Sequence, residues 1–298
     1  MNFIENALGY KHQWWRYLLN LLLCFIFSNV LVFIGTIVCM ACGMPMGEIM
    51  AISSSTNGIY ALVIFTITLL SFLLSFKCIH RGKFSLLIKG EKPFNWKNFA
   101  MLFGVIVVIL GIISTIEMLV MGNYSYSFQL KQDLPLLLLL LPLVALQTLF
   151  EEIVFRAYIP QGLSLFIKNK WVCVVIAAFL FMLLHCVNQP VIEGGALFFI
   201  PYFVIGLSLG FIAFYDNGIE KAWAVHFANN VIAMFFIIDE KPELSNMPSL
   251  FKYNGIDPQN GWDIIYVSVF YMAVAFCLYK VYKWNSTPKQ SCTSQQDC

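Results

Sequence analysis

Long apolar runs, separated by short polar segments, make up most of this chain. A helix needs about 20 apolar residues to cross a bilayer core of about 30 Å, and only helices and closed barrels satisfy their backbone within a membrane. The runs lack the two-residue alternation of barrel strands, so we predict an all-α, polytopic membrane protein. The eight membrane-spanning helices that we expect are Tyr17–Ala41, Ile59–Lys77, Phe99–Val120, Leu134–Phe155, Trp171–Val187, Ala196–Tyr215, Lys221–Ile238 and Trp262–Val281. The seventh is the weakest, because His226, Asn229 and Asn230 interrupt it.

The composition of the chain supports the same class. Apolar residues make up 60% of the 298 residues and charged residues only 11%, against roughly 45–50% and 25% in soluble domains. So few charges could not cover the surface of a soluble fold, which excludes a soluble enzyme, a disordered chain and a nucleic-acid-binding protein. The net charge of +2 gives no sign of a polyanionic partner, so the partner that composition predicts is the lipid bilayer.

Lys and Arg predict the orientation, because they concentrate in cytoplasmic loops. If both termini are cytoplasmic, only Lys131, Lys241 and Lys252 of the 18 basic residues lie outside. We therefore expect an even number of spans and cytoplasmic termini, with residues 1–16 and 284–298 as the polar ends of a single membrane domain. The membrane would be the plasma (inner) membrane in a bacterium or the endoplasmic reticulum in a eukaryote.

A few polar residues fall inside the predicted spans, where an ionisable group costs about 2.5–3.5 kcal/mol and is a functional candidate by default. Along the chain they are Glu117, Glu151, Glu152, Arg156, His185, His226 and Asn230. Two of the four histidines of the chain are among them. Glu117 belongs to none of the motifs described below, and we interpret it as structural or as facing the outer interface.

Helical spacing organises these residues. Glu152 and Arg156 are four residues apart, so they share a helix face and can pair. Glu151 lies about 100° around the helix from Glu152, which leaves it free to act as a general base. His226 and Asn230 are also four residues apart, and an imidazole and an amide on one face could bind an oxyanion. Taken singly, an interfacial salt bridge and hydrogen-bonded helix contacts are the commoner explanations of such residues.

Depth in the membrane complicates this grouping. At about 1.5 Å per residue, Glu151 and His226 lie about 4 and 8 Å above the inner edge of the bilayer core, but His185 lies about 21 Å above it. The three converge if the fifth span projects into the cytosol before Val175 and the fourth span enters the core near Leu138. We therefore expect an intramembrane cavity that faces the cytoplasm, with the fifth span entering the core later than its hydropathy suggests.

Three spaced motifs contain these residues: EExxxR in EEIVFR (151–156), FxxxH in FMLLH (181–185) and HxxxN in HFANN (226–230). Their order, on the fourth, fifth and seventh spans of an eight-helix protein, resembles the CPBP family of intramembrane proteases, the group of CAAX prenyl endopeptidases and bacteriocin-processing (Abi) proteins. The resemblance covers a catalytic core from about 134 to 238. The first three spans match only in being hydrophobic.

The resemblance implies a role for each motif. Glu151 would be the base that activates a water molecule, aided by His185, while the second Glu and the Arg of EExxxR hold the motif helix in place. His226 and Asn230 would stabilise the oxyanion of a tetrahedral intermediate. The reaction would be hydrolysis of a peptide bond in a membrane-associated substrate, either a prenylated protein or a precursor peptide.

A zinc mechanism stays open in the sequence. Glu151, His185 and His226 could supply three zinc ligands, although the chain has no HExxH pair and the two histidines belong to different helices. We expect no cofactor and favour water activated by Glu and His without a metal.

Two other functions compete with proteolysis. Intramembrane Glu, His and Arg could form the proton relay of a transporter, but the chain shows no inverted repeat and no pair of Gly- or Pro-broken helices. The chain could also be a non-catalytic membrane partner, such as a bacteriocin-immunity or scaffold protein.

Overall fold

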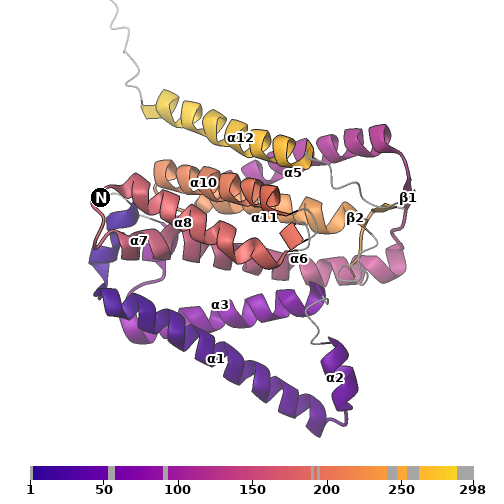
Figure 1. The fold of residues 1–298 in the computed structure, drawn as a ribbon, viewed down its shortest axis with the longest axis horizontal. Coiled ribbons are helices and arrows are strands. Elements are labelled where there is room, and N and C mark those ends of the chain that lie inside the picture. Colours follow the sequence, from indigo (N-terminus) through magenta and orange to yellow (C-terminus); the bar gives the residue numbers. More distant parts are fainter. Residues whose placement is uncertain are drawn as a thin grey trace, which may run out of the picture.

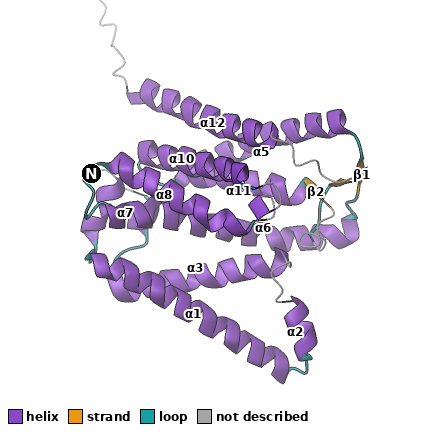
Figure 2. Ribbon diagram, viewed as in Figure 1, coloured by secondary structure: helices purple, strands orange, loops and turns teal. Residues whose placement is uncertain are grey.

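The computed structural model describes residues 3–52, 58–89, 93–188, 191–192, 195–239, 247–253 and 262–286. Its α-helices are α1 (Trp14–Ala41), α2 (Met46–Ile52), α3 (Gly58–His80), α4 (Ser85–Ile88), α5 (Trp96–Met121), α6 (Leu130–Glu152), α7 (Ile159–Leu163), α8 (Lys170–Leu184), α10 (Phe199–Asp216), α11 (Glu220–Phe235) and α12 (Trp262–Ser286). The 3-10 helices are η1 (Phe3–Gly9), η3 (His185–Val187) and η4 (Ala196–Phe198), and η2 (Ile153–Tyr158) is a π-helix. The strands are β1 (Tyr124–Tyr126), β2 (Ile237–Asp239) and β3 (Phe251–Tyr253). Figure 2 shows that helices dominate the described part of the chain.

The protein is a polytopic α-helical membrane protein. Among the described residues, six helical segments are long and apolar enough to cross a bilayer: Trp14–Ala41, Gly58–His80, Trp96–Val120, Leu130–Leu163, Ala196–Asp216 and Ile264–Lys283. The predicted fifth and seventh spans correspond to α8, with 15 residues, and α11, with 16. Both are shorter than the roughly 20 residues of a full span, so the count of eight stays a prediction.

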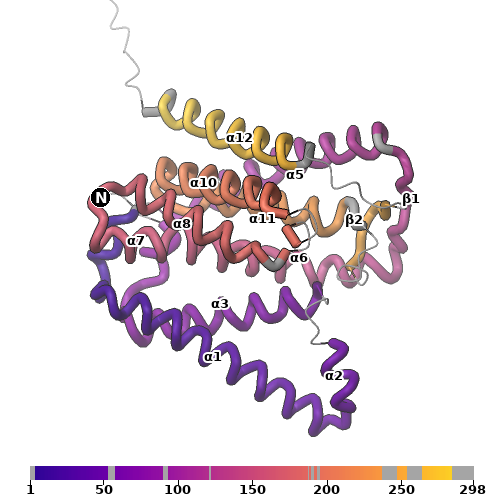
Figure 3. Tube along the Cα trace, in the orientation of Figure 1, coloured from indigo at the N-terminus to yellow at the C-terminus, as the bar shows by residue number. Residues whose placement is uncertain are grey.

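The helices lie in layers, with the motif helices in the middle (Figure 1). Helices α1 and α3 lie on one side, α12 lies on the other, and α6, α8, α10 and α11 lie between them (Figures 1 and 3). α6 contacts α3 and α11, while α10 packs against both α8 and α12. This arrangement surrounds the residues of EExxxR with protein rather than with lipid.

The backbones of α8 and α10 lie close together. A Cβ atom added at Gly206 of α10 would lie only 3.1 Å from the backbone of Ala178 in α8. Small residues at such a contact let two membrane helices pack closely. The contact fixes the position of α8, which carries Phe181 of the FxxxH motif and leads directly into His185.

A three-stranded sheet closes one end of the bundle, in the order β1-β3-β2. β1 pairs antiparallel with β3, and β2 pairs parallel with it. The sequence prediction extended the seventh span to Ile238, and that boundary is wrong: α11 ends at Phe235 and the next residues join the sheet. The backbone donors of Leu250 and Phe251 bind the carbonyl oxygens of Phe235 and Phe236, so strand pairing replaces the last helical turn.

Buried polar side chains join the N-terminal segment and α1 to the π-helix. The hydroxyl of Tyr158 in η2 donates to the carbonyl oxygen of Tyr17 at 3.2 Å and lies 2.9 Å from Nε2 of His80. The hydroxyl of Tyr10 donates to Oε1 of Gln161 at 2.5 Å and lies 3.1 Å from the hydroxyl of Tyr17. The first helices therefore hold the segment that carries the motif arginine.

We expect Tyr158→Phe to lower the stability of the protein. The change leaves His80 and the Tyr17 carbonyl without the hydroxyl, at a cost of about 1–3 kcal/mol for buried polar groups. The apparent melting midpoint in detergent measures this, with Tyr215→Phe as the matched control, because the contacts of Tyr215 within the described part of the chain are ring contacts. Equal midpoints for the two variants would contradict the anchoring role of Tyr158.

Candidate active site

The EExxxR motif spans the junction of an α-helix and a π-helix. Glu151 and Glu152 are the last residues of α6, and Arg156 lies in η2. π-helical turns are rare and occur frequently at functional sites. The predicted ion pair is confirmed: Arg156 Nε lies 3.3 Å from Glu152 Oε2, and both side chains are almost fully buried. The guanidinium group also lies over the ring of Phe181, 4.4 Å from its centroid.

Glu151 is not free, in contrast to the sequence prediction. Nε2 of Gln147 donates to Oε1 of Glu151, and Nε2 of His226 lies 3.6 Å from Oε2. The physical reason is helical spacing: Gln147 lies one turn before Glu151 on the same face of α6. The carboxylate is therefore oriented by an amide on one oxygen and faces an imidazole with the other.

His226 lies between two carboxylates. Its Nδ1 donates to Glu152 Oε1 at 2.8 Å, and its Nε2 faces Glu151. The first contact fixes the tautomer and the orientation of the ring. Glu152 thus binds Arg156 through one oxygen and His226 through the other, so the EExxxR and HxxxN motifs meet in one buried cluster.

Asn230 reaches the same cluster through Gln147. Its Nδ2 donates to Gln147 Oε1 at 3.0 Å, and Asn229 Nδ2 donates to Asn230 Oδ1 at 3.2 Å. Gln147 was missed by the sequence analysis, although an amide inside a span, one turn before a candidate base, was a usable signal. A side-chain amide has two N–H donors, so Asn230 keeps one for a further partner.

His185 begins the 3-10 turn that follows α8. Its Nδ1 donates to the carbonyl oxygen of Phe181 at 2.7 Å, and its ring stacks on Tyr202 with the centroids 4.4 Å apart. Because Nδ1 is engaged, Nε2 is the ring nitrogen that remains for chemistry. Nδ2 of Asn188 binds the hydroxyl of Tyr202 at 3.1 Å and supports this stack.

One cavity of about 540 Å³ collects the candidate residues. Its polar lining comprises Gln147, Glu151, His185, Asn188, Tyr202, His226, Asn229, Asn230 and Tyr271. The structure therefore brings Glu151, His185 and His226 together along one cavity, despite their different calculated depths. Glu152 and Arg156 lie behind the lining, where they hold His226 and η2.

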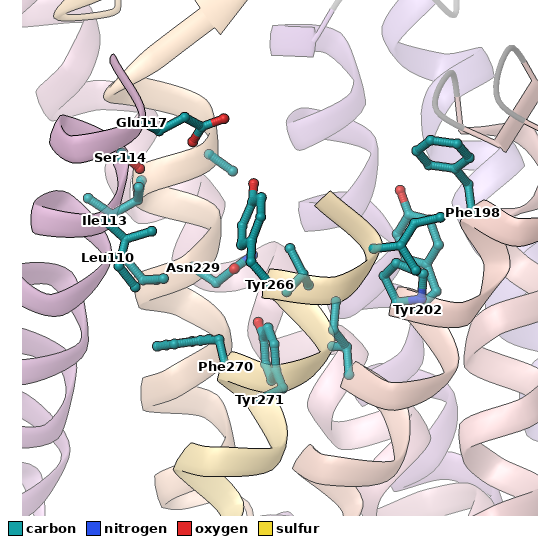
Figure 4. Close-up of a pocket in the computed structure, with 16 residues that line it drawn as sticks. Leu110, Ile113, Ser114, Glu117, Phe198, Tyr202, Asn229, Tyr266, Phe270 and Tyr271 are labelled. Atoms are coloured by element: carbon teal, nitrogen blue, oxygen red, sulfur yellow. The ribbon is translucent and has the colours of Figure 1, made fainter. Parts of the chain in front are cut away.

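A second cavity of about 340 Å³ lies next to the first and shares Tyr202, Asn229 and Tyr271 with it. Figure 4 shows α5 contributing Ser114 and Glu117 on one side of this cavity, with Tyr266 and Tyr271 of α12 between them and Tyr202. Glu117 therefore lines the second cavity, among mainly apolar side chains, and not the cavity that contains Glu151.

Among the described residues, no three His, Cys, Asp or Glu side chains are grouped closely enough to hold one metal ion. In the alternative set of Glu151, His185 and His226, Nδ1 of His185 binds the Phe181 carbonyl, Nδ1 of His226 binds Glu152, and Nε2 of His226 faces Glu151. The site is therefore built around hydrogen bonds between its own side chains.

Comparison with known proteins gives a family for the central segment. Residues 133–232 match the family described as type II CAAX prenyl endopeptidase Rce1-like, and all three motifs lie inside this segment. The chain is also 25% identical over 213 residues to the uncharacterised protein YyaK of Bacillus subtilis (strain 168), covering 70% of each chain. No solved structure matches. The resemblance of this membrane protein to the CPBP family of CAAX-type proteases is thus confirmed.

We expect Arg156→Met to destabilise the protein strongly, by about 3–5 kcal/mol, because it leaves Glu152 as an uncompensated buried charge. The double variant Glu152→Gln/Arg156→Met removes both charges and should recover part of the loss. Apparent melting midpoints of the two proteins in detergent measure the difference. A double variant less stable than Arg156→Met would contradict the buried ion pair.

Proposed function

We propose that the chain is an intramembrane endopeptidase of the CPBP type, which hydrolyses a peptide bond in a membrane-associated substrate. The observation that carries the proposal is that Glu151, His185, His226 and Asn230, from three separate segments of the chain, line one cavity. Their chemistry supplies a base and hydrogen-bond donors at one place. The substrate class that the family name suggests is a prenylated protein, and a precursor peptide is the alternative.

Water activation is assigned to Glu151. Its carboxylate takes a proton from a water molecule, and the resulting hydroxide attacks the carbonyl carbon of the scissile bond. Gln147 holds the carboxylate through Oε1, and Nε2 of His185 binds the same water from across the cavity. Glu151 then passes its proton to the leaving amine, so the peptide and one water give a carboxylic acid and an amine.

Oxyanion stabilisation is assigned to His226 and Asn230. Asn230 offers its second N–H, and His226 offers Nε2–H when the ring carries two protons. The two side chains therefore place hydrogen-bond donors where the reaction develops a negative charge.

The proposed reaction involves no metal. The hydrogen-bonded arrangement of Glu151, His185 and His226 supports this choice, because the described residues offer no three-ligand group. Cleavage that resists a chelator would agree with it, and cleavage that a chelator abolishes and zinc restores would overturn it.

The orientation that we propose places both termini and the active-site cavity on the cytoplasmic side. The backbone of Lys11 binds the carbonyl oxygen of His80 at 3.1 Å, so the start of α1 and the end of α3 lie at the same end of the bundle. Figure 1 places the end of α12 at that end too. An even number of membrane crossings gives this arrangement.

We expect Glu151→Gln to lower the rate of peptide cleavage by about 10²–10⁴-fold, the usual contribution of a general base. The measurement uses purified protein and a panel of matched prenylated and unprenylated peptides, with and without chelator. Glu117→Gln is the control, because that carboxylate lines the other cavity. Full activity of Glu151→Gln would overturn the proposal, and proton flux into liposomes that survives this change would favour a transporter.

Two native cysteines test the orientation. Cys42 follows the last residue of α1, and Cys78 lies in the last turn of α3, at opposite ends of the two helices. In cells that express variants with a single cysteine, a membrane-impermeant maleimide should label Cys42 in intact cells and Cys78 only after permeabilisation. The opposite pattern would place the termini outside.

A further inference from the structure

Tyr271 lies at the active site but outside the three motifs. It belongs to α12, beyond the segment that matches the family, and its side chain is completely buried. It lines both the active-site cavity and the second cavity, where Figure 4 shows it beside Phe270 and below Tyr266. Among the described residues its hydroxyl has no hydrogen-bond partner, which is rare for a buried polar group.

Glu152 and Arg156 also contain buried polar atoms that have no hydrogen-bond partner among the described residues. Oε2 of Glu152 and all three guanidinium nitrogens of Arg156 are buried without a hydrogen-bond partner in the described chain. Their ion-pair contact is 3.3 Å long, and Tyr271 lines the same cavity as Phe181, which lies against Arg156, and His226, which binds Glu152. One hydrogen-bond acceptor and several hydrogen-bond donors thus lie close together in the protein interior without forming hydrogen bonds to each other.

We propose that Tyr271, Arg156 and Glu152 bind a buried water molecule, and that Tyr271 is a positioning residue for His226. A buried water makes about three hydrogen bonds to groups that lack partners. This water accepts from an N–H of Arg156 and from the hydroxyl of Tyr271, and it donates to Oε2 of Glu152. The set gives each of these three side chains a hydrogen bond through a single molecule.

The water site acts on catalysis through Glu152. Because Oε1 of Glu152 holds Nδ1 of His226, a second bond at Oε2 fixes the rotation of the carboxylate and with it the imidazole ring. A small displacement of such a ring is enough to lower a catalytic rate substantially. This consequence rests on the proposed peptidase function, whereas the water site itself does not.

The test compares Tyr271→Phe with Tyr279→Phe in the full-length protein. Tyr279 lies on the same helix, away from both cavities, and packs against the rings of Phe211 and Tyr215. We expect Tyr271→Phe to lower kcat about tenfold, with KM changed less than about twofold, since the water does not touch the substrate. Its apparent melting midpoint should fall by roughly 2–4 °C, and Tyr279→Phe should match the wild type in all three values.

The direction of the change in melting midpoint shows whether the hydroxyl of Tyr271 is hydrogen-bonded in the folded protein. A buried hydroxyl without any partner is removed at no cost or with a gain in stability, whereas a bonded one is removed with a loss. A Tyr271→Phe protein that melts at or above the wild-type temperature therefore overturns the water site. A loss of stability with unchanged kcat overturns the positioning role.

A high-resolution map of the full-length protein in detergent gives a readout that needs no substrate. We expect density within hydrogen-bond distance of Tyr271, Arg156 and Glu152 in the wild type, and none in Tyr271→Phe. A wild-type map without that density overturns the inference. If the density is present and the wild type cleaves no peptide of the panel, the proposed function fails while the water site stands.

Discussion

Glu152 holds the candidate active site together because it is shared by two buried partners. One carboxylate oxygen faces Arg156 in the π-helix, and the other accepts a hydrogen bond from His226 on α11. Removing an ion from water costs several kcal/mol in a protein interior, and this cost is repaid only when every charge is paired in good geometry. The carboxylate of Glu152 therefore fixes the π-helix η2 and α11 relative to each other, which hydropathy alone does not do.

The first helices of the chain hold the two segments, η2 and α11, that meet at Glu152. Tyr158 follows Arg156 in η2 and is held by Tyr17 and His80, which fixes the π-helix from the side of α1 and α3. α11 is anchored at its first residue, where Glu220 accepts from Lys89 and from the backbone of Asn95, each at 2.7 Å. Both segments that meet at Glu152 are thus tied to the N-terminal third of the chain.

Spacing along the sequence predicted what lies within one helix. The pairing of Glu152 with Arg156 and the grouping of His226 with Asn230 follow from positions four residues apart. Apolar runs likewise predicted the long helices, since length and composition determine which segments can cross a bilayer.

Contacts between helices could not be predicted in the same way. The hydrogen bond from Asn230 to Gln147, the position of Arg156 over Phe181 and the end of α11 at the small sheet depend on which helices become neighbours. Hydropathy carries no such information, because lipid and protein neighbours are equally apolar. This is why the contact of Glu151 with His226 on α11 could not be predicted, whereas its contact with Gln147, four residues earlier on α6, could have been.

The central claim is that Glu151 activates water and does not itself attack the peptide. The most direct test is a single turnover of a cleavable peptide in water enriched in ¹⁸O, followed by mass spectrometry of the product and of the protein. Direct attack by water predicts one solvent oxygen in the new carboxyl group of the product and none in the side chain of Glu151. Solvent oxygen in the carboxyl group of Glu151 would show a covalent intermediate and contradict the account.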